Sequence, residues 1–89
     1  MGFLDTWYLY VLLCADGSYY TGITKDTERR LHEHNKTKRG AKYTRTRRPV
    51  QLVHVEVFSL HGEALRAERR FKRLTRKQKE EVINATLRP

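Results

Sequence analysis

The chain has 89 residues, enough for one small domain, of which 38% are hydrophobic and 33% charged. Its formal net charge of +9 makes nucleic acid the leading partner. A single cysteine excludes an internal disulfide, and no apolar run approaches the roughly 20 residues that span a bilayer. Nothing resembles a signal peptide, so we expect a protein of the reducing cytoplasm without membrane contact. The composition does not define an oligomeric state, and we favour a monomer.

Two aromatic-rich runs flank Asp16-Gly17 and predict a β-hairpin. The first run, Trp7–Cys14, is apolar on both alternating faces, as expected of a strand that is covered on two sides. We expect Cys14 to be a buried small hydrophobic residue. The second run, Tyr19–Ile23, is the returning strand.

The length of the turn decides which side chains of the hairpin meet. A two-residue loop would point Tyr10 and Tyr20 to opposite faces of the sheet. A three-residue loop over 15–17, with Gly17 in the left-handed conformation, pairs Tyr10 with Gly22 and puts both tyrosines on one side. We prefer the longer loop, because Gly22 then leaves room beside Tyr10.

A helix is predicted from Asp26 to about Lys36, with Asp26 or Thr24 as its cap. Arg30 and His34 stand four residues apart and therefore share one face of it. The following segment 36–48 is predicted to be a loop, with no acidic residue and a single aromatic, Tyr43. Its basic residues are predicted to contact a phosphate backbone rather than only solvent: Lys36, Lys38, Arg39, Lys42, Arg45, Arg47 and Arg48.

The remaining segment predicts one strand and two helices. Val50–Phe58 alternates, and we expect one face to carry Val53, Val55 and Val57 and the other to carry Leu52, His54, Glu56 and Phe58. A second helix has an apolar stripe of Leu60, Ala64, Ala67, Phe71 and Leu74. Thr75 and Gln78 form a capping box that opens a third helix to about Leu87.

These elements predict one α+β domain over 1–89, of the α/β sandwich type, with its core at about 7–82. A small three-stranded antiparallel sheet is flanked by helices in the order β-β-α-β-α-α.

Glu68 is the acidic residue best placed for chemistry. It lies beside the Ala67/Phe71 stripe, at the rim of the buried face, where a carboxylate can reach a cleft. A lone carboxylate suits Mg2+, which keeps most of its waters and takes other ligands from phosphate. The alternative is an ion pair within the helix, with Lys72 or Arg69. Taken singly, Tyr10, Tyr20, Arg30 and His34 are also compatible with purely structural roles.

Together these residues resemble the GIY-YIG nuclease superfamily over roughly Trp7 to Val82. Tyr8-Leu9-Tyr10 stands in the place of the first tripeptide and keeps its final tyrosine, and Tyr20-Thr21-Gly22 stands in the place of the second. Arg30, His34 and Glu68 match the helix arginine, the histidine one turn later and the metal-holding carboxylate. Details such as Gly-Ala-Lys-Tyr-Thr-Arg resemble the small stand-alone bacterial subgroup under an uncharacterised-protein label, the YhbQ-like group.

The resemblance implies a metal-dependent endonuclease that hydrolyses DNA phosphodiester bonds, with RNA left open as a substrate. The implied catalytic residues are Tyr10, Tyr20, Arg30, His34 and Glu68, with Glu68 holding a single Mg2+ or Mn2+. Either Tyr10 or His34 is the candidate base that activates water. Lys72 joins the basic loop as a candidate nucleic-acid contact.

Two other interpretations stand beside this one. The first is a nucleic-acid-binding domain that retains the nuclease fold without cutting. The second is a structural module whose charge serves solubility. Glu68 beside a cationic cleft favours the nuclease over a pure binder, and the basic loop disfavours the structural module.

Overall fold

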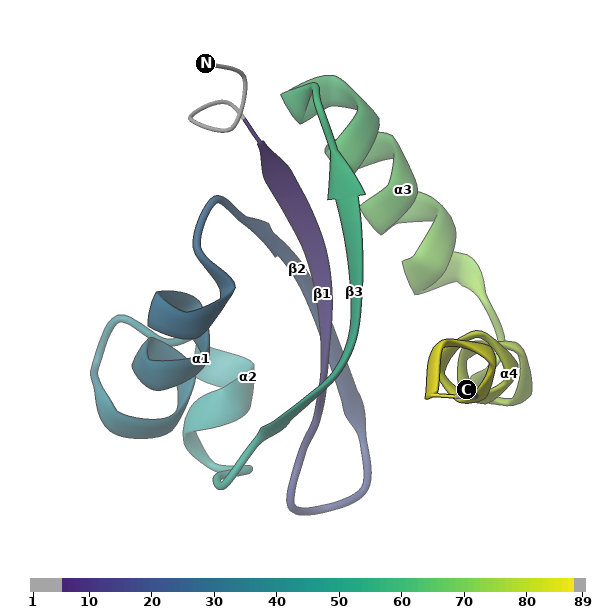
Figure 1. Cartoon of the computed structure of the whole chain (residues 1–89). Coiled ribbons are helices and arrows are strands. Elements are labelled where there is room, and N and C mark those ends of the chain that lie inside the picture. Colours follow the sequence, from purple (N-terminus) through teal and green to yellow (C-terminus); the bar gives the residue numbers. More distant parts are fainter. Residues whose placement is uncertain (1–5, 88–89) are drawn as a thin grey trace.

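A computed structural model describes residues 6–87, which form a three-stranded antiparallel sheet with helices on both faces (Figure 1). The strands are β1 (Trp7–Leu13), β2 (Tyr19–Thr24) and β3 (Gln51–Phe58), with β1 in the middle. The helices are α1 (Thr27–Lys36), α2 (Lys42–Arg45), α3 (His61–Arg73) and α4 (Arg76–Leu87). The predicted α+β class and element order are confirmed, and α2 is one additional short helix within the predicted loop.

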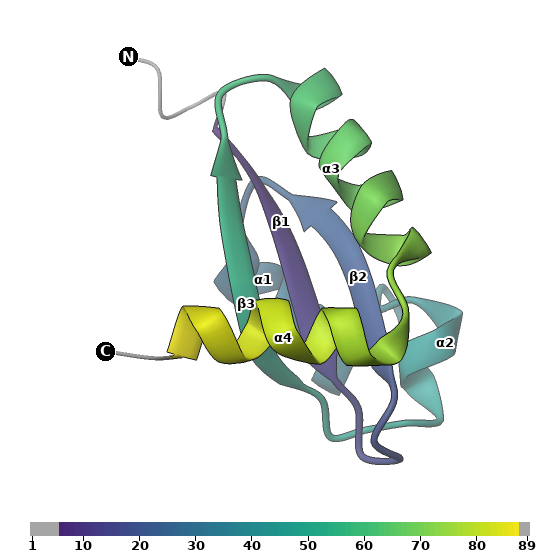
Figure 2. The ribbon, with the colours of Figure 1, turned by 90° about the vertical axis from the view of Figure 1, so that its right-hand side faces the viewer.

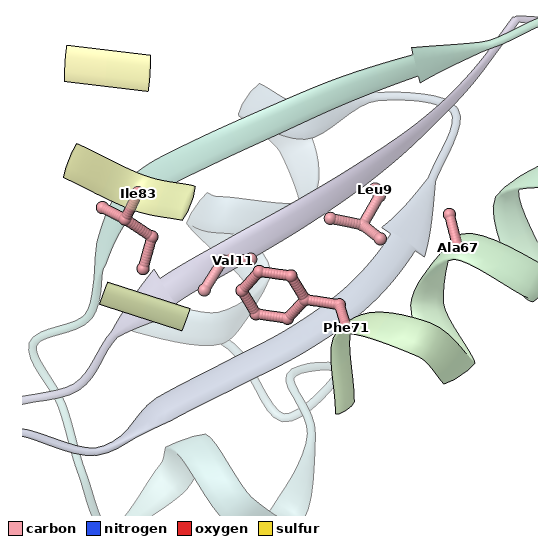
Figure 3. Close-up of a cluster of buried hydrophobic side chains, with 5 residues drawn as sticks. All are labelled: Leu9, Val11, Ala67, Phe71 and Ile83. Atoms are coloured by element: carbon pink, nitrogen blue, oxygen red, sulfur yellow. The ribbon is translucent and has the colours of Figure 1, made fainter. Parts of the chain in front are cut away.

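The sheet separates two hydrophobic clusters. Helices α3 and α4 cover one face (Figure 2). The buried side chains there are Leu9, Val11, Ala67, Phe71 and Ile83 (Figure 3). Helices α1 and α2 cover the other face (Figure 1), where the buried side chains are Tyr10, Leu12, Cys14 and Val50. The central strand therefore buries both of its faces, as its sequence predicted, and Cys14 is 3% exposed. None of the helices described is long and apolar enough to cross a membrane.

The hairpin has the predicted three-residue loop. Cys14 and Ser18 close it through a backbone hydrogen bond of 2.8 Å, and Gly17 has a φ of 85°. This left-handed conformation is accessible to glycine without a steric penalty. Tyr10 consequently pairs with Gly22, in the predicted register.

The predicted helix caps are also present. Of the two candidates for α1, Asp26 is the N-cap and accepts a hydrogen bond from the backbone N–H of Arg29 at 3.0 Å. Thr24 instead accepts one from the N–H of Asp26 at 3.1 Å. At α4, Thr75 and Gln78 each accept the other's backbone N–H, at 3.2 and 2.9 Å. Both signals act locally, which is why sequence alone identified them.

The predicted alternation of β3 is wrong at its beginning. Pairing with β1 shifts register between Val11 and Leu12, so one residue of β3 is extra. Val53 and His54 both pack on the α3 and α4 side, whereas Leu52 packs with the Tyr10 cluster on the other side. A β-bulge of this kind places two consecutive residues against one partner, which reverses the alternation beyond it.

Leu60 does not belong to the buried stripe of the second helix. It precedes α3 with an extended backbone, at φ −124° and ψ 137°, and it is 62% exposed. The helical period therefore does not reach it, while Ala64, Ala67 and Phe71 are buried as predicted.

Gly40 permits a close contact between the basic loop and α1. A Cβ at this position would lie 2.7 Å from both the Glu33 carbonyl oxygen and the His34 Cα. We predict that Gly40→Ala destabilises the fold by about 1–3 kcal/mol, because backbone atoms would have to move. Gly62→Ala is the control, since its Cβ would meet only the tip of Arg66, at 3.6 Å. Urea denaturation measures both variants, and equal stabilities would contradict the prediction.

Candidate active site

The hairpin brings Tyr10 and Tyr20 together on the side of the sheet that faces α1. Their ring centroids are 6.4 Å apart, so the predicted same-side arrangement is confirmed. Tyr10 reaches from β1 across Gly22 in β2, where a Cβ would lie only 2.6 Å from the Tyr10 hydroxyl. Gly22 is therefore required for this position of the hydroxyl.

His34 of α1 meets Tyr10 in the interior. The His34 Nε2 atom lies 2.8 Å from the Tyr10 hydroxyl, and the two residues are 0% and 2% exposed. The Tyr20 ring lies 5.1 Å from the imidazole. Tyr10, Tyr20 and His34 thus form one aromatic cluster between β1, β2 and α1.

The basic loop determines the tautomer of His34. The backbone N–H of Ala41 donates to Nδ1 at 3.2 Å, so Nδ1 is an acceptor. The Thr44 hydroxyl lies 3.0 Å from Nδ1 and donates to the Ala41 carbonyl at 2.8 Å. The ring proton is therefore assigned to Nε2, which donates to the Tyr10 oxygen.

Burial controls both pKa values of this pair. Burial, followed by the nearby Arg30 guanidinium, lowers the pKa of His34 to about 4. Burial, followed by Tyr20, raises the pKa of Tyr10 to about 12; Arg30 opposes this rise and Glu68 adds to it. Both side chains are neutral at pH 7, and Arg30 and Glu68 both act on the Tyr10 hydroxyl.

Arg30 is held in place by two hydrogen-bond acceptors. Its guanidinium donates to Glu33 at 2.9 Å and to the Arg39 carbonyl at 2.7 Å. The side chain is 26% exposed, which leaves part of the guanidinium available to a ligand. These contacts fix a positive charge beside Tyr10 before any substrate arrives.

Glu68 approaches from α3, which packs against β1 and β2. Its side chain is 18% exposed, and its Oε2 lies 3.4 Å from the Lys72 ammonium. The pair anticipated as an alternative is thus present. Residues 6–87 contain no group of three or more His, Cys, Asp or Glu side chains that could hold a metal ion. A lone, accessible carboxylate nevertheless fits a hydrated Mg2+ whose other ligands come from phosphate.

Three arginines of the basic loop have partners within the protein. Arg48 donates to the carbonyls of His34, Glu33 and Thr37 at the end of α1. Arg47 pairs with Asp16 at 2.9 Å, and Arg45 donates to the Lys38 carbonyl at 2.6 Å. Their charges contribute to the local field, while their hydrogen bonds stabilise the loop.

The other cationic side chains of this segment are exposed. They form no hydrogen bond or ion pair with any part of the chain that the structure describes, and they are Lys36, Lys38, Arg39 and Lys42. They leave a positively charged surface next to the Tyr10–His34 pair. Such a surface attracts polyanions.

A small cavity of about 200 Å3 opens at the edge of the sheet beside β2. It is lined by Tyr19, Tyr20, Thr21, Tyr43, Lys72 and Lys79. Three positions that shape the site were not singled out from the sequence: Gly40, Ala41 and Thr44. The Gly-Ala-Lys-Tyr-Thr-Arg segment was noted, but a helix as short as α2 has too few residues to show a period.

The fold and this cluster define a GIY-YIG domain. A family model described as the GIY-YIG catalytic domain matches residues 6–81, so the chain belongs to this nuclease family. A UPF0213 protein of Enterococcus faecalis is 58% identical over 78 residues, which are 85% of this chain and 88% of the relative. A UPF0213 protein of Bacillus velezensis is 58% identical over 76 residues, 85% of this chain and 76% of the relative.

Two solved structures of similar proteins have the same fold. The solution NMR structure of an E. faecalis protein has a TM-score of 0.63 and 54% identity, covering 91% of this chain and 85% of that one. The solution NMR structure of a UPF0213 protein of Bacillus halodurans has a TM-score of 0.59 and 44% identity, covering 90% and 84%. The resemblance to the small subgroup is confirmed.

The depressed pKa of His34 predicts an acid-sensitive fold. Its ordinary value is 6.5 and its folded value about 4, so between these values the unfolded chain binds a proton that the folded chain does not. The contribution of His34 to stability should be constant above about pH 7, and stability should fall by roughly 3 kcal/mol on acidification toward pH 4. Urea denaturation at several pH values measures this change.

His34→Gln should flatten the stability profile between about pH 6.5 and 4.5. The exposed His32→Gln serves as the control and should retain the parent profile. Stability of the parent that stays constant from pH 7 to 5 would show that His34 is not held neutral by burial.

Proposed function

We propose that this protein is a metal-dependent endonuclease of the cytoplasm that hydrolyses DNA phosphodiester bonds, acting as a monomer on branched or damaged forms in repair or processing. One observation carries the proposal: the Tyr10 hydroxyl receives a hydrogen bond from buried His34 and lies in the fields of Arg30 and Glu68. A purely structural tyrosine needs neither an opposing pair of charges nor a buried imidazole.

The tautomer of His34 favours Tyr10 as the base. The Nδ1 of His34 already accepts the Ala41 N–H and its Nε2 carries the ring proton, so the imidazole has no free lone pair to take a proton from water. Its Nε2–H instead stabilises an anionic Tyr10 oxygen and fixes the ring. In this assignment Tyr10 takes the proton of the attacking water, while His34 acts as a positioning residue.

Tyr10 requires additional positive charge to act as a base. With a pKa of about 12, its ionisation at pH 7 costs about 7 kcal/mol. Arg30 lowers that pKa and would neutralise a non-bridging phosphate oxygen. A divalent cation held by Glu68 would supply further positive charge and stabilise the departing oxygen. Tyr20, beside Tyr10, would orient the water or the phosphate.

The exposed cations of the basic loop would bind the phosphates on either side of the scissile bond. Lys36, Lys38, Arg39 and Lys42 are the primary candidates, because their side chains have no partner among residues 6–87. Arg45, Arg47 and Arg48 would act mainly by holding the loop in place. Lys72 would contact a phosphate beside Glu68.

The sharpest test is the charge of Glu68. Glu68→Gln keeps the shape of the side chain but removes the charge that attracts Mg2+. Metal-dependent nicking of supercoiled DNA should fall at least about a hundredfold, or roughly 2.7 kcal/mol. Removing the half-exposed pair with Lys72 should change stability by less than about 1 kcal/mol.

Glu63→Gln is the matched control for this test, since Glu63 lies in the same helix without an ion pair among the described residues. It should nick like the parent, and EDTA should stop both proteins. A Glu68→Gln protein that binds DNA and nicks at the parental rate would leave a binding domain as the function. A variant that does not fold would make Glu68 a structural residue.

Salt dependence tests the proposed contact surface. Replacing Lys36, Lys38, Arg39 and Lys42 by alanine should lower the slope of log affinity against log salt by about 0.9 for each phosphate of duplex DNA that the variant no longer neutralises. The control removes equal charge from the α3 and α4 side, at Arg66, Arg70, Arg73 and Lys77. Fluorescence anisotropy without metal measures both slopes. Equal reductions would mean that binding depends on net charge alone.

A further inference from the structure

Tyr43 is an exposed aromatic side chain held in a fixed orientation. It is 38% exposed, and the Arg47 guanidinium covers one face of its ring at 3.8 Å. Arg47 is fixed in turn by Asp16 at 2.9 Å and by the Tyr43 carbonyl at 2.8 Å. The loop itself is held by other contacts, since Thr44 is fully buried. The position of Tyr43 is thus ordered although its ring adds little to the core.

The Tyr43 ring lies next to the candidate active site. It lies 6.0 Å from the Tyr20 ring, at an interplanar angle of 28°. Both rings line the cavity at the edge of β2, together with Lys72 and Lys79 from α3 and α4. One part of the cavity wall is therefore aromatic and another is cationic.

This combination matches the two parts of a nucleotide. A base stacks on aromatic rings, and its phosphate is attracted to ammonium groups. The cavity, at about 200 Å3, is below the roughly 300–1,000 Å3 of sites for whole drug-sized ligands, which suits one base. The faces of paired bases are covered by their neighbours in a duplex, so only an unpaired base can present its face to Tyr43.

We infer that Tyr43 and Tyr20 form a stacking site for an unpaired nucleotide next to the scissile phosphate, with Lys72 and Lys79 attracting its phosphate. The inference rests on the proposed nuclease function and specifies its substrate class: strands with a single-stranded segment, of DNA or RNA. The basic loop then binds the flanking backbone, while the stacked base fixes the register of the strand.

Binding without metal, in the Glu68→Gln protein, separates stacking from attraction to phosphate. The probes are fluorescein-labelled oligothymidylate, its oligouridylate counterpart and an abasic strand of the same length and charge. Oligothymidylate or oligouridylate should bind about five- to a hundredfold more tightly than the abasic strand. Whichever of the two, DNA or RNA, binds more tightly relative to the abasic strand identifies the preferred sugar of the substrate. Equal affinity for all three strands, or no binding, would overturn the inference.

Variants at two adjacent residues identify the group responsible. Tyr43→Ala should lose the preference for strands with bases, and Tyr43→Phe should keep it. Lys42→Ala, which removes a neighbouring charge, should weaken binding to all strands equally. A Tyr43→Ala protein that folds and retains the full preference would overturn the inference. The comparison with the abasic strand is made with Tyr43 intact, so it tests the inference even if the Tyr43→Ala protein does not fold.

The nicking assay keeps the two proposals distinguishable. A protein that prefers strands with bases but never cuts refutes the nuclease and supports the stacking site. A protein that cuts with metal but binds abasic and base-containing strands equally supports the nuclease and refutes the stacking site.

Discussion

The hydrogen bond between His34 and Tyr10 is the constraint on which the site depends. It joins α1 to the central strand in the interior, where His34 is 0% and Tyr10 is 2% exposed. Two glycines make it geometrically available: Gly22 admits the tyrosine hydroxyl, and Gly40 brings the Ala41 N–H to the far side of the imidazole. Because both ring nitrogens are occupied, the buried histidine carries no unsatisfied polar atom, and a neutral state is favoured.

The basic loop has a defined conformation although the chain carries a net charge of +9. Arg45, Arg47 and Arg48 direct their guanidinium groups at carbonyl oxygens and at Asp16, so much of the local repulsion is offset by charge-assisted hydrogen bonds. Lysine ammonium groups are compact and strongly hydrated, and those of the loop remain in solvent. The arginines therefore shape the loop, and lysines make up most of the free positive charge.

Sequence reasoning succeeded where a local rule determines the outcome. Gly17 defines the turn, the turn defines the register, and the register places Tyr10 beside Gly22. It failed at Val53, because an alternating run does not reveal which residue a bulge leaves extra. The contacts of Ala41 and Thr44 with His34 were equally inaccessible, since they depend on how the loop folds back over α1. The roles of Glu68 and the loop cations remain predictions.

The position of the site at a sheet edge follows from a sheet that is covered by helices on both faces. Tyr10 belongs to the cluster under α1, whereas Glu68 comes from the helix that covers the opposite face. The backbone of a sheet separates side chains on its two faces, so they approach one another only at an edge. The edge strand here is β2, and its Gly22 lies beside the Tyr10 hydroxyl. Each layer thus supplies part of one electrostatic environment, and the packing of α3 on β1 and β2 sets its geometry. Core substitutions that shift α1 or α3 relative to the sheet would therefore change the distances among Tyr10, Arg30 and Glu68, in addition to their direct cost in packing.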